Sequence, residues 1–154
     1  MQIMKSPLLL SFCLLATNFL TAQTDALKIS IIGLSHTHVH WVFDSRKRGD
    51  IDVIGIVEPD RQLAARFAEQ YDYPMKHIYP DTESMIRACG LPEAVAAFGT
   101  IYDHLEVVET FAPLSVDVMV EKPLAVSVKH ARKMAALAKE YNIHLITNYE
   151  TSWY

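Results

Sequence analysis

The feature that most constrains the fold of this chain is a regular alternation between short apolar runs rich in β-branched residues and segments with helical spacing. The first pair is LKISIIG, residues 27–33, and HVHWVFDSRKR, residues 38–48, which stops at Gly49. The second pair is IDVIGIVEPD, residues 51–60, and a helical segment for which Asp60 is a suitable N-cap. Strands that alternate with helices pair in parallel through right-handed crossovers. The sequence therefore predicts an α/β fold with a doubly wound parallel sheet.

The alternation continues with a weaker unit, HIYPDTESMIRACG. It predicts a short strand, a turn at Pro80, and a helix that begins after Asp81 or Thr82 and ends at Gly90. Cys89 would then be a packing residue at the helix end.

Two more strands are predicted in EAVAAFGT and VDVMVEKP, with the helical YDHLEVVETFA between them. SVKHARKMAALAKEY predicts an amphipathic helix, and IHLITNY a sixth strand. The residues expected on the inward face of this last helix are Val128, Ala131, Ala135 and Ala138.

The N-terminal segment differs in character from the rest of the chain. It has a single Lys5, an apolar stretch from Leu8 to Leu20 and a small residue at Ala22, which is the layout of a secretory signal peptide. The apolar stretch is shorter than the roughly 20 residues that a membrane span needs. We expect a signal peptide over residues 1–23, a single dinucleotide-binding domain over residues 24–154, a periplasmic or secreted location, and no stable membrane span after cleavage.

Charge and cysteine content argue against a nucleic-acid-binding protein and against a disulfide-stabilised one. The formal net charge is -4, and the 14 lysines and arginines form no basic run longer than Arg46-Lys47-Arg48, so we expect no nucleic-acid partner. Only Cys89 remains after the predicted cleavage, so no internal disulfide is possible.

The turn after the first strand is the candidate phosphate site, because ligands of this fold bind at the carboxyl ends of the strands. Its expected G-x-G-x-x-G pattern is represented here by Gly33, Ser35 and His38. Glu58 ends the second strand near the position, about 20 residues further on, where a carboxylate binds the ribose hydroxyls of the dinucleotide. Such an acid repels a 2'-phosphate, which favours NAD over NADP; the alternative is a solvated glutamate before Pro59.

Three alternating histidines follow the glycine. On a helix, His36 and His40 would share one face and His38 would lie on another. A histidine pair with this spacing holds zinc only if a third ligand comes from elsewhere, and no cysteine or acidic cluster accompanies it in the sequence. The pattern favours a polar lining for a cofactor cleft and no metal. A zinc protein and incidental polarity of the first helical turn remain alternatives.

Five motifs together give the chain a family resemblance: GLSHTH, VEPD, AARFAEQY, DHLEVV and VEKPLA. In this order and spacing, the sequence over residues 28–150 resembles the Gfo/Idh/MocA family of nicotinamide-dependent oxidoreductases. The resemblance implies a Rossmann-type domain that binds NAD. It also implies catalytic roles for Lys122, which would lie near the nicotinamide and the reacting hydroxyl, and for His104, for which a structural hydrogen bond is the alternative. The cofactor-binding residues it implies are Gly33, Ser35, His36, Thr37, His38, Glu58, Gly99, Thr100, Glu121, Lys122 and Asn148.

The resemblance further implies reversible hydride transfer between NAD and a secondary alcohol of a sugar or polyol. Members carry a second α/β domain that contacts the substrate, so we expect this chain to be the cofactor-binding half of a longer enzyme, and the full-length protein to be a homo-oligomer. The alternatives are an NAD-dependent glycosidase or lyase that uses transient redox, and a non-catalytic nucleotide- or sugar-binding remnant. The sequence departs from the family pattern at His38, Ser115 and Glu150.

Overall fold

The structure of the protein is a computed structural model, and it describes residues 26–149. The predicted signal peptide and Glu150 lie outside the described residues. Among residues 26–149, no helix has the length and apolar character needed to cross a lipid bilayer.

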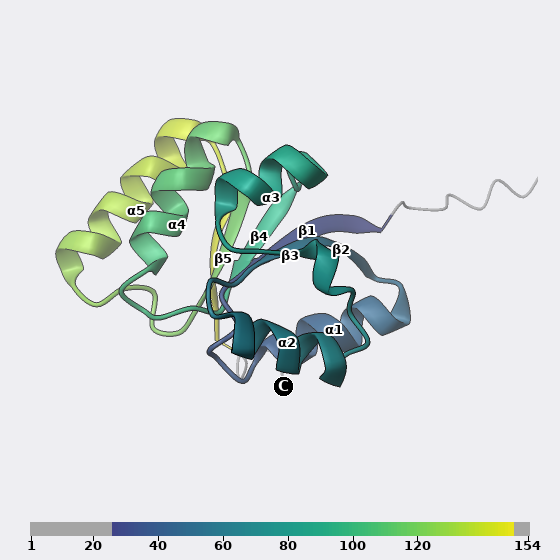
Figure 1. The fold of residues 1–154 in the computed structure, drawn as a ribbon. Helices are drawn as coiled ribbons and strands as arrows, with labels where there is room; N and C mark the ends of the chain where they lie inside the picture. The colour runs from purple at the N-terminus through teal and green to yellow at the C-terminus, as the bar shows by residue number, and fades with distance from the viewer. Residues whose placement is uncertain (1–25, 150–154) are drawn as a thin grey trace, which may run out of the picture.

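Six parallel strands form one sheet in the order β3-β2-β1-β4-β5-β6 (Figure 1). This order, with an α-helix in every crossover, is that of the Rossmann fold, and it confirms the predicted doubly wound parallel sheet. The elements are β1 (Leu27–Ile32), α1 (Val39–Arg48), β2 (Ile51–Val57), α2 (Arg61–Gln70), the short 3-10 helix η1 (Met75–His77), β3 (Ile78–Tyr79), α3 (Thr82–Cys89), β4 (Ala94–Ala97), α4 (His104–Phe111), the 3-10 helix η2 (Ala112–Leu114), β5 (Asp117–Glu121), α5 (Val128–Tyr141) and β6 (Leu145–Asn148).

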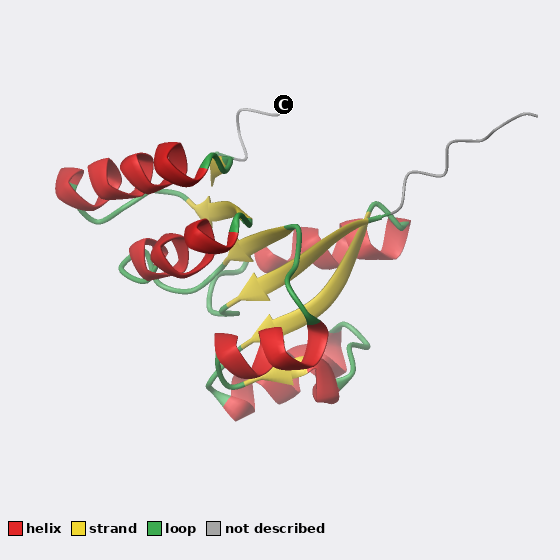
Figure 2. Cartoon of the chain, turned by 90° about the horizontal axis from the view of Figure 1, so that it is seen from above, coloured by secondary structure: helices red, strands yellow, loops and turns green. Residues whose placement is uncertain are grey.

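Two hydrophobic clusters, one on each face of the sheet, hold the helices in place. Helices α1 and α2 cover one face, and α3, α4 and α5 cover the other, so the sheet lies between two helical layers (Figures 1 and 2). Phe43 of α1 is buried in the first cluster, and Phe111 of α4 and Met134 of α5 are buried in the second. Because both faces are covered, the central strands read as continuous apolar runs rather than as an alternation.

The helix boundaries follow the caps that the sequence predicts. Gly49 ends α1 in the left-handed conformation, with φ 82°. The Asp60 carboxylate accepts two backbone N–H groups of the first turn of α2. For α3 the cap is Asp81 rather than Thr82, and Cys89 at the end of this helix packs with its Sγ 3.2 Å from the Tyr79 hydroxyl.

The prediction for the inward face of α5 is wrong at two positions. Val128 is 67% exposed and Ala135 is exposed, whereas Met134 is fully buried and Leu137 and Tyr141 pack against the second cluster. These three larger residues also follow helical spacing, and they bury more apolar area than a valine and alanines do. The helix is therefore oriented by its larger side chains.

Candidate functional site

Two loops meet above the carboxyl ends of β1 and β4, and Gly33 sets their distance. Gly33 has φ +78°, and its N–H donates to the carbonyl of Val57 at 2.8 Å. A Cβ at this position would lie 2.7 Å from both the Cα and the N of Gly99. The turn therefore requires glycine for its conformation and for the close approach of the second loop.

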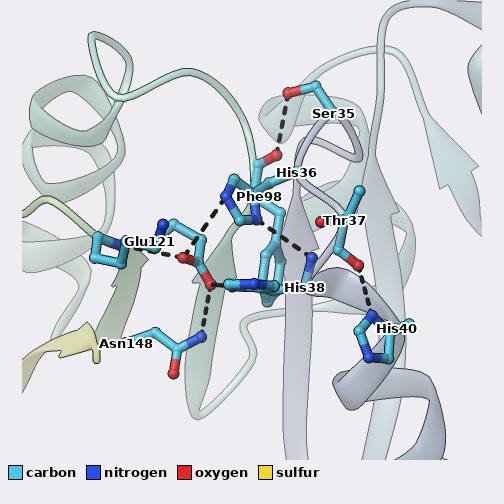
Figure 3. Close-up of polar contacts among 9 residues, drawn as sticks. Ser35, His36, Thr37, His38, His40, Phe98, Glu121 and Asn148 are labelled. Atoms are coloured by element: carbon cyan, nitrogen blue, oxygen red, sulfur yellow. Dashed lines mark hydrogen bonds and ion pairs between the residues drawn. The ribbon is translucent and has the colours of Figure 1, made fainter. Parts of the chain in front are cut away.

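The residues after Gly33 tie this turn to the loop after β4. The N–H of His36 donates to the carbonyl of Phe98 at 2.9 Å, and the Ser35 hydroxyl donates to the same oxygen at 3.2 Å. Thr37 offers its carbonyl to the Nδ1–H of His40 at 2.7 Å, which closes the first turn leading into α1 (Figure 3). These hydrogen bonds fix the backbone of the predicted phosphate turn.

Glu58 has a local role that the sequence did not indicate. Its side chain is buried, at 5% exposure, and its two carboxylate oxygens accept the backbone N–H groups of Leu34 and Asp60, each at 2.9 Å. The residue therefore links the loops after β1 and β2 by charge-assisted hydrogen bonds. Each oxygen keeps a lone pair for a ligand, and the ribose contact stays a prediction.

A cavity of about 430 Å³ opens between the ends of β1, β2 and β4, in the volume range of small-molecule sites. Gly33 and Gly99 line it together with three acidic residues, Asp81, Asp103 and Glu106. Hydrogen bonds from Ser84 hold the pKa of Asp81 below its usual value.

Asp103 is a residue of this site that sequence reasoning missed. Its carboxylate accepts the Thr100 hydroxyl at 2.6 Å and the Thr100 N–H at 3.1 Å, which shapes the loop that carries Gly99. The sequence signal that could have indicated this contact is Thr100 three positions before an aspartate at the start of a helix. Thr100 lies between Gly99 and Asp103, which both line the cavity, and its contact with the cofactor stays a prediction.

At the other end of the same edge, two histidines converge on a buried glutamate (Figure 3). His38 Nδ1 lies 3.0 Å from Glu121 Oε1, and His36 Nε2 lies 3.9 Å from Glu121 Oε2. The predicted pairing of His36 with His40 is wrong, because α1 begins only at Val39 and His36 lies in the turn before it. The rings of His36 and His38 instead meet edge to face, with centroids 4.4 Å apart.

Glu121 is 1% exposed at the carboxyl end of β5, opposite Asn148 of β6. The Asn148 side-chain amide donates to Oε1 at 2.6 Å, and the Lys122 N–H donates to Oε2 at 3.1 Å. The structure therefore brings together four predicted cofactor contacts that are distant in sequence, His36, His38, Glu121 and Asn148.

Lys122 and His104 lie beside this cluster in different surroundings. Lys122 is exposed, and a cis peptide bond joins it to Pro123. His104 is 1% exposed; its Nδ1–H donates to the Leu124 carbonyl at 3.1 Å, and its Nε2 has no hydrogen-bond partner among the described residues. Burial lowers the pKa of His104, so the imidazole is neutral at pH 7 and ties the start of α4 to the segment after β5.

Comparison with known proteins was made for sequence and for structure. The family described as "Oxidoreductase family, NAD-binding Rossmann fold", named GFO_IDH_MocA, matches residues 27–149. No curated protein matches the chain in sequence.

Three similar solved structures illustrate the structural match. An oxidoreductase from Agrobacterium radiobacter in complex with NAD+, L-tartaric acid and magnesium has a TM-score of 0.72 and 21% identity, over 82% of this chain and 36% of that one. An aldose-aldose oxidoreductase from Caulobacter crescentus complexed with glycerol has a TM-score of 0.68 and 22% identity, over 83% and 39%. An inositol dehydrogenase homolog from Azotobacter vinelandii, complexed with NADH and myo-inositol, has a TM-score of 0.66 and 16% identity, over 82% and 35%. The match thus spans somewhat more than a third of the length of these proteins, and at such identities it shows the fold.

Proposed function

This chain belongs to the Gfo/Idh/MocA oxidoreductase family with an NAD-binding Rossmann fold, and on that premise we propose that it is the NAD-binding half of an enzyme that oxidises or reduces a sugar or polyol. The observation that carries the proposal is the placement of the glycine turn, the acidic cavity and the Glu121-Lys122-Pro123 motif along one carboxyl edge of the sheet. That edge is where ligands of doubly wound sheets bind.

The described residues fit NAD. The positive φ of Gly33 and its contact with Gly99 hold the two loops close enough to form a narrow cradle, and the cavity beside them has room for a nucleoside. The turn over residues 33–38 would hold the diphosphate, with Glu58 near the ribose and the loop at Gly99 and Thr100 near the adenosine end. Glu121, Lys122 and Asn148 would lie at the nicotinamide end. The acidic lining favours NAD over NADP, because it repels a 2'-phosphate.

The bound cofactor would accept the hydride, and the protein would orient the alcohol and move its proton. In the direction of reduction, the exposed Lys122 ammonium would donate a hydrogen bond to the substrate carbonyl oxygen and then pass its Nζ proton to that oxygen. In the direction of oxidation, the same nitrogen would take the hydroxyl proton back. Glu121, held by Asn148 and by the Lys122 N–H, fixes the backbone from which the lysine side chain projects. His104 buttresses the following segment through its hydrogen bond to Leu124.

Calorimetric titration of the full chain tests the cofactor assignment. We expect NAD to bind and NADP to bind at least ten times more weakly. Gly33→Ala should lose NAD affinity, whereas Gly49→Ala, which also replaces a glycine at positive φ but lies outside the site, should keep it. Absence of heat with both nucleotides at millimolar concentration would overturn the assignment.

A second candidate follows from the N-terminal signal-like segment, which favours a periplasmic or secreted protein. A glycosidase or lyase that oxidises a sugar carbon, eliminates the aglycone and then reduces the sugar again regenerates its own NAD, which suits a compartment with little free cofactor. Incubating the protein together with its substrate domain with an aryl glycoside separates the two candidates. Release of the aglycone without accumulation of NADH supports the second, and NADH formation from a free sugar supports the first.

N-terminal sequencing of the exported protein tests cleavage near Ala22 or Gln23.

A further inference from the structure

We propose that His36, His38 and Glu121 form a binding site for a divalent transition metal ion, with zinc as the expected ion. The proposal goes beyond NAD binding, and because the same turn and Glu121 are proposed to contact the cofactor, zinc binding is tested in the absence of NAD. Two imidazoles and one carboxylate are the protein ligands of many catalytic zinc sites, which leave a further coordination position open for water or substrate.

The geometry of the three side chains suits a single ion. Ligand atoms about 2.0 to 2.1 Å from a tetrahedral metal lie about 3.3 Å from one another. Here His38 Nδ1 and Glu121 Oε1 are 3.0 Å apart, His36 Nε2 and Glu121 Oε2 are 3.9 Å apart, and all three ligand atoms lie within 4.8 Å of one another. The set is thus wider than that of a bound ion, and rotation of the imidazole rings toward Glu121 would narrow it.

The charge balance of the cluster also calls for a cation. Glu121 is 1% exposed, and among residues 26–149 its ion-pair partners are the two histidines rather than a lysine or arginine. A buried carboxylate is costly unless a cation pairs with it, and a bound dication would do so at the centre of the cluster.

Neighbouring groups hold the ligands as outer partners do in known metal sites. Asn148 and the Lys122 N–H each donate to one oxygen of Glu121, and Trp41 stacks on the ring of His38 with centroids 4.3 Å apart. The side chain of His36 is 30% exposed, which gives an ion and a water molecule a path to the cluster.

The orientation of the His36 ring also suits the site. Its Nδ1 accepts the N–H of His38 at 3.2 Å, which leaves Nε2 as the ring nitrogen that faces Glu121.

Titration of the EDTA-treated full chain with Zn²⁺ alone, followed by calorimetry, tests the site. We expect one ion per chain, no binding of Mg²⁺, and at least a tenfold loss of zinc affinity in His36→Ala and Glu121→Gln. The matched control is His40→Ala, which removes a histidine of the same segment whose Nδ1 is bonded to Thr37 instead, and which should bind zinc as the parent does. Equal losses in His36→Ala and His40→Ala, or no zinc binding by the parent, would overturn the proposal.

A second measurement needs no variant and so does not depend on how the variants fold. Replacing zinc with Co²⁺ in the parent chain should give the intense visible absorption of a tetrahedral or five-coordinate site with nitrogen and oxygen ligands. A weak octahedral spectrum, as for cobalt in water, would contradict an inner site made of these three residues. NAD titration of the metal-free chain shows separately whether the cofactor site is intact.

Discussion

Replacing Gly33 by alanine should destabilise the protein more than the same change at any other glycine with positive φ. Two costs add at this position. An alanine at φ +78° costs about 1 to 2 kcal/mol in backbone conformation. Its Cβ would also lie 2.7 Å from two backbone atoms of Gly99, and forcing apart packed segments costs about 1 to 3 kcal/mol. We expect a total loss of about 2 to 5 kcal/mol in the free energy of unfolding.

Gly49→Ala isolates the contact from the conformation. Gly49 has nearly the same φ, +82°, but a Cβ there meets nothing within 4 Å, so this variant bears only the conformational cost. The difference between the two variants therefore measures the contact with Gly99. Urea unfolding followed by circular dichroism at 25 °C gives both values, and in thermal melts the difference corresponds to roughly 3 to 6 °C per kcal/mol. If the two variants lose the same stability within about 0.5 kcal/mol, the two loops do not meet as described.

Three further predictions concern single residues. Ser115 has φ 58° at an exposed turn, so Ser115→Gly should raise the free energy of unfolding by about 0.5 to 1 kcal/mol in the same urea assay; a loss of stability would show that the residue does not adopt this conformation. Glu58→Ala removes the acceptor for two backbone N–H groups and should cost about 2 to 4 kcal/mol, whereas the exposed Glu69→Ala should stay within about 0.5 kcal/mol of the parent; equal effects would argue against the capping role. Burial lowers the pKa of His104, so the unfolded chain takes up a proton near pH 6.5 that the folded chain resists, and stability should fall as the pH drops through that value. His104→Gln should therefore lose less stability between pH 7.5 and 5.5 than the parent does, and parallel pH profiles would contradict the assignment.

The sequence alone determined those parts of the structure that depend on short-range interactions. Asp60 caps α2 and Gly49 ends α1 because each acts on backbone groups within a few residues, and the run of strand and helix patterns leads to the parallel sheet through rules of local handedness. The turn at Gly33 was found in the same way, because its left-handed glycine follows directly after a strand.

The candidate site was predicted less completely, because its contacts join segments that are far apart in the chain. The sequence offered no third partner for the histidines, since Glu121 reaches His36 and His38 only when β5 lies in the same sheet as β1, with β4 between them. For the same reason, the contact between Glu58 and the Leu34 N–H follows from the parallel pairing of β2 with β1.

Helix α5 shows that tertiary packing also decides between faces that the sequence leaves nearly equivalent. Its alanine positions and its larger apolar positions both follow helical spacing, and only contact with the sheet selects Met134 as the buried residue. Local periodicity thus determined which elements form and in what order. The tertiary structure decided which side chains meet. Burial and charge compensation act between segments that are far apart in the chain, and no local sequence pattern shows which of these segments come into contact.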